Sequence, residues 1–199
     1  MSTNTDATNR LPNTQSGFTL IELLVVIAIM VIVASIVLLQ APNSKSSFTL
    51  LNDAYQIALL TREAQSYGSS VREGQTPGEF DVGYGIYLDS GDSDSIILFN
   101  DVDKDMAYSS SNDLVVSTLR LTDNNVITQF CGVSSGGTLC SGGSLDNLSI
   151  TFVRPDPDAN IWGDDGSDEY ENATIDIEAP EGHARTITIY TTGQISITE

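Results

Sequence analysis

The sequence predicts an α+β fold in which a long N-terminal helix precedes and packs on an antiparallel β-sheet head. The first observation is an apolar run of 22 residues, from Phe18 to Leu39, with one charged side chain, Glu22. The second is a change of period: beyond residue 83, short segments alternate apolar and polar residues and are separated by Gly- and Asp-rich turns. A long helix followed by short neighbouring strands is typical of the α+β class.

The apolar run, residues 18–39, is long enough to cross a membrane. At about 1.5 Å per residue, a helix of this length spans roughly 33 Å, which matches the hydrocarbon core of a bilayer. A buried core helix is the alternative, but such a helix is rarely apolar on every face over this length. The run therefore predicts a single transmembrane helix.

Glu22 lies on the fifth residue of that run. A carboxylate near the centre of a bilayer costs about 2.5–3.5 kcal/mol, and less near an interface. A passive anchor gains nothing from this cost, so we expect Glu22 to have a cationic partner. The alternative is a side chain that extends to the lipid headgroups.

The junction before the run, Gly17-Phe18-Thr19-Leu20-Ile21-Glu22, resembles the processing site of type IV pilins and of the pseudopilins of type II secretion. All six positions match the family motif. The resemblance implies that a prepilin peptidase cleaves after Gly17 and that Phe18 becomes the N-methylated mature N-terminus. It further implies that Glu22 neutralises the terminal amine of a neighbouring subunit during assembly.

Residues 1–17 are expected to be the prepilin leader peptide. They are polar and contain no apolar segment, so they do not form an ordinary secretory signal peptide. Leaders of the family are usually basic, whereas here Arg10 is offset by Asp6. The predicted orientation, with the head outside the cytoplasm, therefore depends on the motif more than on charge.

Residues 40–67 are predicted to continue the helix as an amphipathic segment. Pro42 either ends the helix or kinks it, and we favour the kink. Gly68 is a candidate C-cap. A helix lying on the membrane is the alternative, but the polar face is not strongly basic. The predicted apolar face comprises Phe48, Leu51, Tyr55, Ala58 and Leu59, widened by Leu50, Ala54 and Ile57, and Lys45, Asp53, Arg62 and Glu63 are assigned to the opposite side.

Residues 68–199 are predicted to form the β-rich extracytoplasmic head. A loop is expected from Gly74 to Gly85. The C-terminal sequence TITIYTTGQISIT resembles the end of minor pilins of the GspH/FimT type, although this match is looser than that of the N-terminal motif. The predicted strands are 84–88 and 96–99 as a hairpin, 114–121 and 125–130 as a second pair around Asp123-Asn124, 148–153, 173–177, and 186–197 broken at Thr192-Gly193.

Four carboxylates, Asp101, Asp103, Asp105 and Asp113, form a candidate calcium site. The first three have the alternating spacing of a calcium loop. An EF-hand is excluded, because Met106 replaces its glycine and Asn112 its glutamate. A compact calcium loop between strands remains, and some pseudopilins use calcium in this way. The alternative is a solvated acidic turn.

A second acidic loop, residues 156–171, contains the single tryptophan, Trp162. Its carboxylates are dense enough for a cation but irregularly spaced, so a charged surface loop is the alternative. Cys131 and Cys140 enclose eight residues rich in Gly and Ser, and we predict a disulfide that contributes about 2–3 kcal/mol. Metal binding by the two cysteines is less well supported, because His183 is the sole histidine.

The sequence gives little support for an enzyme. The letters of a nucleophile elbow occur at Gly132–Gly136, but no helical segment follows, and only His183 could act as a base. No cofactor other than calcium is expected. The net charge of −19 repels nucleic acid, so no DNA binding is expected.

The leading hypothesis is a structural subunit of a type IV pilus-like filament, most specifically a minor pseudopilin of type II secretion. Its partners would be the prepilin peptidase, other pilin or pseudopilin subunits and the inner membrane assembly platform. The chain would be a single-pass inner membrane protein before assembly, and then part of a periplasmic or surface filament. The alternatives are a major or minor type IV pilin that serves adhesion, motility or DNA uptake, and an enzyme on an ordinary anchor.

Overall fold

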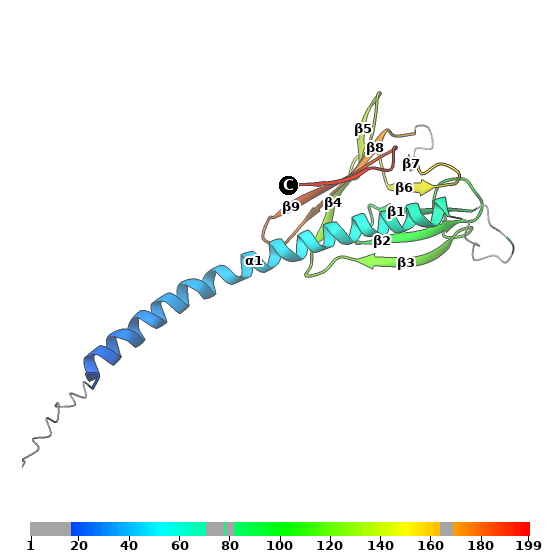
Figure 1. Cartoon of the computed structure of the whole chain (residues 1–199). Helices are drawn as coiled ribbons and strands as arrows, with labels where there is room; N and C mark the ends of the chain where they lie inside the picture. The colour runs from blue at the N-terminus through cyan, green and yellow to red at the C-terminus, as the bar shows by residue number, and fades with distance from the viewer. Residues whose placement is uncertain (1–16, 71–77, 79–81, 164–168) are drawn as a thin grey trace, which may run out of the picture. The chain divides into compact units, whose positions relative to one another are not determined.

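The structure is a computed structural model that describes residues 17–70, 78, 82–163 and 169–199, without the side chains of residues 39–44. One helix, α1 (Leu20–Ser69), precedes all the strands (Figure 1). The chain forms two compact units, Met1–Ala41 and Pro42–Glu199. The strands are β1 (Gly83–Asp89), β2 (Asp92–Asp101), β3 (Leu114–Arg120), β4 (Val126–Ser134), β5 (Gly137–Cys140), β6 (Asn147–Phe152), β7 (Ala159–Gly163), β8 (Asn172–Glu178), β9 (Ala184–Tyr190) and β10 (Ile195–Thr198).

The first unit contains the apolar part of α1. The helix begins just after Thr19, whose hydroxyl oxygen accepts a hydrogen bond from the Glu22 amide at 3.3 Å. This is the bond that an N-cap residue makes to the third helical position. The helix continues across Pro42. The interpretation that Pro42 ends the helix is therefore wrong.

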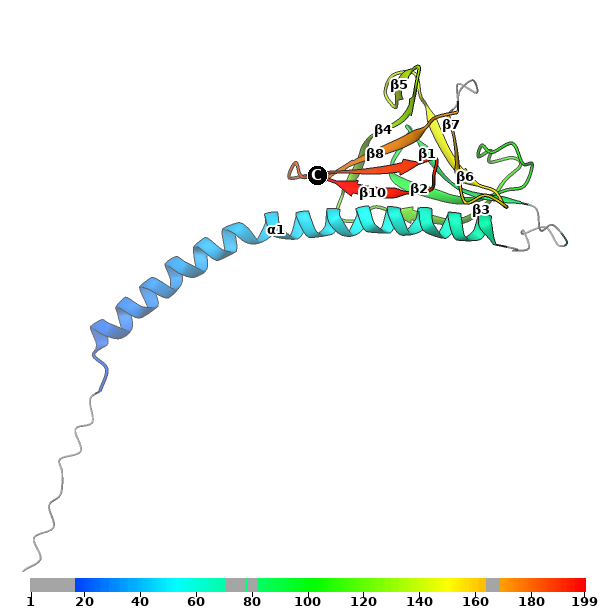
Figure 2. The same ribbon diagram turned by 45° about the horizontal axis from the view of Figure 1, so that its top comes forward.

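The second unit contains two antiparallel five-stranded sheets, so the predicted α+β class is confirmed. One has the strand order β3-β2-β1-β6-β7 and the other β10-β9-β8-β4-β5. The predicted hairpin of β1 and β2 is present, and the C-terminal segment forms the hairpin of β9 and β10. Figure 2 shows β8, β9 and β10 as neighbouring orange and red strands.

The predicted pairing of residues 114–121 with 125–130 is wrong. Both segments are strands, but β3 belongs to the first sheet and β4 to the second. Between them, Asp123 and Asn124 have positive φ values of 52° and 61°. Because this turn passes the chain from one sheet to the other, its two strands do not form a hairpin.

One further expectation needs correction, and two strands were missed. The predicted loop from Gly74 to Gly85 overlaps the start of β1, which begins at Gly83; residues 71–77 and 79–81 of that loop lie outside the described residues. The short strands β5 and β7 were not predicted. Neither has the long alternating pattern that makes a strand recognisable in sequence.

One hydrophobic core joins α1 to both sheets. The helix contributes Leu50, Ala54, Ile57, Leu60 and Ala64, all buried. The first sheet contributes residues such as Ile86 and Ile150, and the second such as Ile175 and Ile187. Figure 2 shows the cyan part of α1 running along one side of the β-strands.

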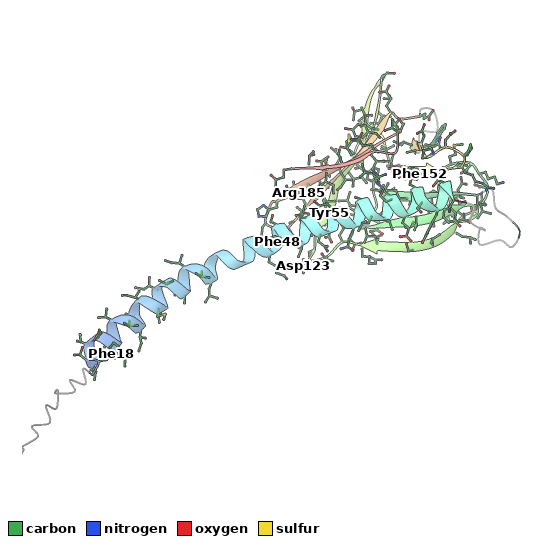
Figure 3. All side chains as sticks on the ribbon, viewed as in Figure 1. Phe18, Phe48, Tyr55, Asp123, Phe152 and Arg185 are labelled. Carbon is green, nitrogen blue, oxygen red and sulfur yellow. A yellow bond between two sulfur atoms is a disulfide. The ribbon has the colours of Figure 1, made fainter. Side chains whose placement is uncertain are left out.

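The buried face of α1 differs from the predicted one. Phe48, Tyr55 and Leu59 are exposed by 72%, 56% and 67%, and Figure 3 labels Phe48 and Tyr55 on the helix. Asp53, assigned to the polar side, is instead 1% exposed. Its carboxylate accepts bonds from the Thr122 amide at 3.0 Å and from Asn125 Nδ2 at 2.7 Å, and these bonds compensate for its burial.

Gly68 is not a C-cap. It lies inside α1, one residue before the helix ends at Ser69, and it is buried. A Cβ atom at this position would overlap the carbonyl group of Phe152 in β6. Glycine therefore permits the close approach of the helix to the sheet backbone.

We expect Gly68→Ala to destabilise the head by about 3 kcal/mol, because backbone atoms must move to admit the methyl group. The measurement is thermal unfolding of the full-length chain in detergent micelles. Gly136→Ala is the matched control: a Cβ there approaches only the Ser134 hydroxyl, at 3.7 Å. Equal melting temperatures for the two variants would contradict this explanation of Gly68.

Candidate functional site: a processing and assembly segment, and an acidic loop

The apolar segment Leu20–Leu38 meets the length and hydropathy expected of a membrane span. It comprises 19 residues with a mean hydropathy of 3.1, and none of its most apolar window is buried within the structure. Its large side chains, from Leu20 to Leu38, are 47–81% exposed. A helix that is apolar and uncovered on all faces must be covered by lipid or by other chains.

Gly17 and Phe18, the predicted processing site, lie just before this helix. Phe18 is 88% exposed. A Cβ atom added to Gly17 would meet nothing within 4 Å, and Gly17 is not among the glycines with positive φ. The fold of this chain therefore does not require glycine at position 17.

Glu22 occupies the third position of α1, where its backbone amide bonds to the Thr19 hydroxyl. The order Thr19, Leu20, Ile21, Glu22 is that of a capping box, and an acidic residue in a first helical turn is favoured by the helix dipole. This local role was not recognised from sequence. Among the described side chains, none forms an ion pair with Glu22.

Three of the four predicted calcium ligands lie together. Asp101, Asp103 and Asp105 each place a carboxylate oxygen within 4.8 Å of the other two. Asp101 is 1% exposed, whereas Asp103 and Asp105 are exposed. The turn that brings them together includes Lys104 and Met106, both with positive φ.

Asp113 is not part of this triplet. Its two carboxylate oxygens accept hydrogen bonds from the Val102 amide at 2.9 Å and the Ser109 amide at 2.7 Å. Asp101 likewise accepts from the Lys104 amide at 2.8 Å and the Met106 amide at 3.2 Å. These carboxylates order the loop through backbone bonds, and the oxygens of Asp101 keep lone pairs for a cation.

Burial raises the pKa of Asp101 from 3.8 to about 6, and the nearby charges of Asp113 and Asp105 act in the same direction. Burial also raises the pKa of Asp105. Between the unfolded and folded pKa values the native chain binds more protons than the unfolded chain. The stabilisation of the folded chain by protonated Asp101 is therefore complete below pH 3.8 and is lost as the pH rises through about 6.

In calcium-free buffer we expect the free energy of unfolding to fall by about 2 kcal/mol as the pH rises across this window. Denaturant unfolding of the full-length chain at a series of pH values measures the fall. Asp101→Asn, which does not titrate, should flatten this part of the profile. An unchanged slope in that variant would show that another group is responsible.

The calcium prediction is tested above this window, where the carboxylates are ionised. Millimolar Ca²⁺ should raise the melting temperature and EDTA should reverse the rise, because an ion that binds only the folded chain stabilises it. Asp103→Asn should remove this response to Ca²⁺. Because Asp103 is exposed, the substitution should leave the fold intact, so a lost response can be assigned to a lost ligand. An equal response to Mg²⁺, or in the variant, would exclude a calcium site made by this triplet.

The predicted disulfide joins Cys131 and Cys140, with a Cα–Cα distance of 4.0 Å. The two residues lie opposite one another in β4 and β5. The glycine- and serine-rich segment between them is thus the end of a hairpin. The disulfide holds β5, which buries little apolar surface, against β4.

Among the described residues, the remaining candidates form no further cluster of possible metal ligands. Asp164, Asp165 and Asp168 of the second acidic loop lie outside the described residues, and Asp156 and Asp158 are exposed. Residues Gly132–Gly136 lie in the β4–β5 hairpin, without the strand-turn-helix geometry of a nucleophile elbow. His183 is exposed in the turn before β9.

Comparison with known proteins identifies one match. Residues 12–38 match the family model described as the prokaryotic N-terminal methylation motif. No curated protein and no solved structure matches the chain. The matched segment contains the predicted processing site, Glu22 and the apolar part of α1, and proteins with this motif are structural subunits. This match supports the interpretation of the N-terminal segment as that of a type IV pilin-like or pseudopilin subunit.

Proposed function

We propose that this chain is a minor pseudopilin of a type II secretion system, which is cleaved after Gly17, methylated at Phe18 and assembled through α1. The N-terminal segment carries the proposal. It combines a glycine that the fold does not require, an apolar helix that no described residue covers, and one acidic side chain, Glu22, without an ion-pair partner among the described residues. Each property is explained by a different external molecule: a peptidase, neighbouring helices and a neighbouring terminal amine.

The exposed side of α1 in the second unit supports assembly through the helix. Phe48, Tyr55 and Leu59 are seven and four residues apart, which places them near one face. They are exposed on a helix whose other face is fully used by the core. We infer that α1 of an adjacent subunit covers these side chains in the filament.

The subtype rests on the C-terminal hairpin. The resemblance of residues 186–198 to minor pilins of the GspH/FimT type corresponds to β9 and β10, which pair from Ile195–Ile189 to Thr198–Thr186. The alternative is a subunit of a type IV pilus, which would have the same N-terminal motif. Deletion of the gene distinguishes them: a pseudopilin mutant accumulates exoproteins in the periplasm, whereas a pilin mutant loses surface pili.

Intact mass with N-terminal peptide mapping, on protein from the native membrane, tests the processing step. We expect a chain that begins at N-methylated Phe18. Gly17→Ala should keep the full-length mass, although Gly17 has no structural role that alanine would disturb. Cleavage at another position would contradict the proposal that the prepilin peptidase recognises this junction. Cleavage of the Gly17→Ala chain to the same extent as the natural chain would contradict it too.

The distribution of cations supports the expectation that this subunit does not bind DNA. Lys45 pairs with Asp123 at 3.2 Å and Arg120 with Asp94 at 3.0 Å. Arg185 pairs with Glu199, and Arg62 donates to Gln65 and to the Gly193 carbonyl. On a chain of net charge −19, these paired side chains do not make a basic patch.

A further inference from the structure

The two sheets have four edge strands, and three of them are short or covered. β5 and β10 have four residues each, and β5 is tied to β4 by the disulfide. β7 has five residues, and its Ile161 carbonyl accepts a bond from the Tyr170 amide at 3.1 Å. Short or covered edges are the usual protection against unwanted strand pairing.

β3 is the exception. It has seven residues, Leu114–Arg120, and its sequence LVVSTLR is rich in β-branched residues, with its one charge at the end. Leu114 and Val115 are 38% and 46% exposed. β3 pairs with β2 on one side, and the described residues provide no backbone partner on the other.

The backbone groups at this free edge follow from the hydrogen-bond pattern. The Leu121 amide donates to the Asp94 carbonyl at 2.8 Å, one step beyond the Ser95–Arg120 pair. Bonded and non-bonded pairs alternate in an antiparallel ladder. Thr118 and Arg120 therefore direct their N–H and C=O groups away from β2, where an added strand can bind them.

Charge selects the kind of strand that can bind there. Exposed Asp103 and Asp105 lie in the turn before β3, and Asp103 is bonded to Asn112 at 2.8 Å. Asp94 and Asp123 lie near its other end, each paired with one cation. The cation paired with Asp94 is Arg120 of β3 itself, so the acidic end of the strand is the one next to Asp103 and Asp105. A second copy of β3 would bring together two chains that each have a net charge of −19, and this like charge opposes self-pairing.

We propose that β3 is a strand-addition site for an extended segment of a partner protein, with alternating β-branched residues at its centre and lysine or arginine at its ends. Hydrogen bonds to the backbone of Thr118 and Arg120 supply the affinity, and the basic ends make the site prefer this segment to an acidic one. The site is independent of processing and filament assembly, so it can be tested whether or not the chain is a pseudopilin.

The test uses the full-length chain in non-ionic detergent micelles and a fluorescein-labelled peptide, Lys-Lys-Thr-Val-Thr-Val-Thr-Lys-Lys. We expect a saturable rise in anisotropy that weakens with salt, and slower hydrogen exchange at the Thr118 and Arg120 amides. The same peptide with Glu in place of Lys should bind at least about tenfold more weakly.

Thr118→Pro is the decisive variant. Proline removes an amide that points away from β2, so it blocks strand addition without removing a bond of the sheet. Thr118→Val keeps the amide and should bind like the natural chain. If Thr118→Pro melts at a lower temperature, its loss of binding could come from a damaged fold. Hydrogen exchange of the Thr118 and Arg120 amides in the natural chain, with and without peptide, then decides whether the peptide binds at β3. Undiminished binding by a folded Thr118→Pro chain, unprotected β3 amides, equal binding of the acidic peptide, or dimerisation through β3 would each overturn the proposal.

Discussion

A chain carrying Glu22→Gln is expected to insert into the membrane and to lose its place in the filament. Glutamine is nearly isosteric with glutamate, and the bond from the backbone amide of residue 22 to the Thr19 hydroxyl does not involve the side chain. It cannot neutralise a terminal amine. An unpaired amine or carboxylate in an apolar filament core costs several kcal/mol, so we expect incorporation to fall at least about 100-fold.

The measurement compares the amount of subunit in sheared filaments with the amount in the membrane, for the natural chain and the Glu22→Gln chain. Glu22→Asp is the matched control, since it keeps the charge and should assemble in part. If Glu22→Gln entered filaments as well as the natural chain, Glu22 would act only as a helix cap. If it failed to insert, the loss of assembly could not be assigned to charge pairing.

Replacing Asp53 by alanine is expected to give a large loss of stability for a single polar side chain of the head. The carboxylate is the acceptor for the Thr122 amide and hydroxyl and for Asn125 Nδ2. Alanine leaves these donors without a partner, and Asn125 is 1% exposed. At about 1–3 kcal/mol for each stranded buried donor, we expect a loss of about 3 kcal/mol.

Thermal unfolding of the full-length chain in micelles, followed by near-UV circular dichroism, measures this loss. A melting temperature lower by about 10 °C is expected for a domain of this size. Lys45→Ala is the control, because its ion pair with Asp123 lies in the same region but is 72% and 44% exposed. It should cost less than about 1 kcal/mol. Equal losses in the two variants would show that the turn is not held by Asp53.

Several features of this protein could be determined from sequence because they depend on neighbouring residues alone. The apolar run from Phe18 to Leu39 is a local property, and so is the motif from Gly17 to Glu22 that the family model matches. Alternation of apolar residues identified most strands of the head. The spacing of Cys131 and Cys140 was sufficient to predict the disulfide that the structure contains.

What sequence could not decide depends on contacts between distant residues. Helical spacing alone could not choose between the face with Phe48, Tyr55 and Leu59 and the face with Leu50, Ala54 and Ile57, because both are apolar. The second face packs in the core with both sheets, and Asp53 on the same side can be buried with it because its hydrogen-bond donors lie in a turn 69 to 72 residues later. The position of Gly68 against Phe152 is likewise a property of the packed helix and sheet.

The division of the strands between two sheets was also decided only by the tertiary structure. The segments on either side of Asp123-Asn124 are both good strands, and a hairpin is the arrangement with the shortest connection. They separate because one core, shared by α1 and both sheets, buries more apolar surface than a local hairpin can. Local sequence thus determined most of the segments that form strands and the segment with the length and hydropathy of a membrane span. Long-range burial decided which strands became neighbours.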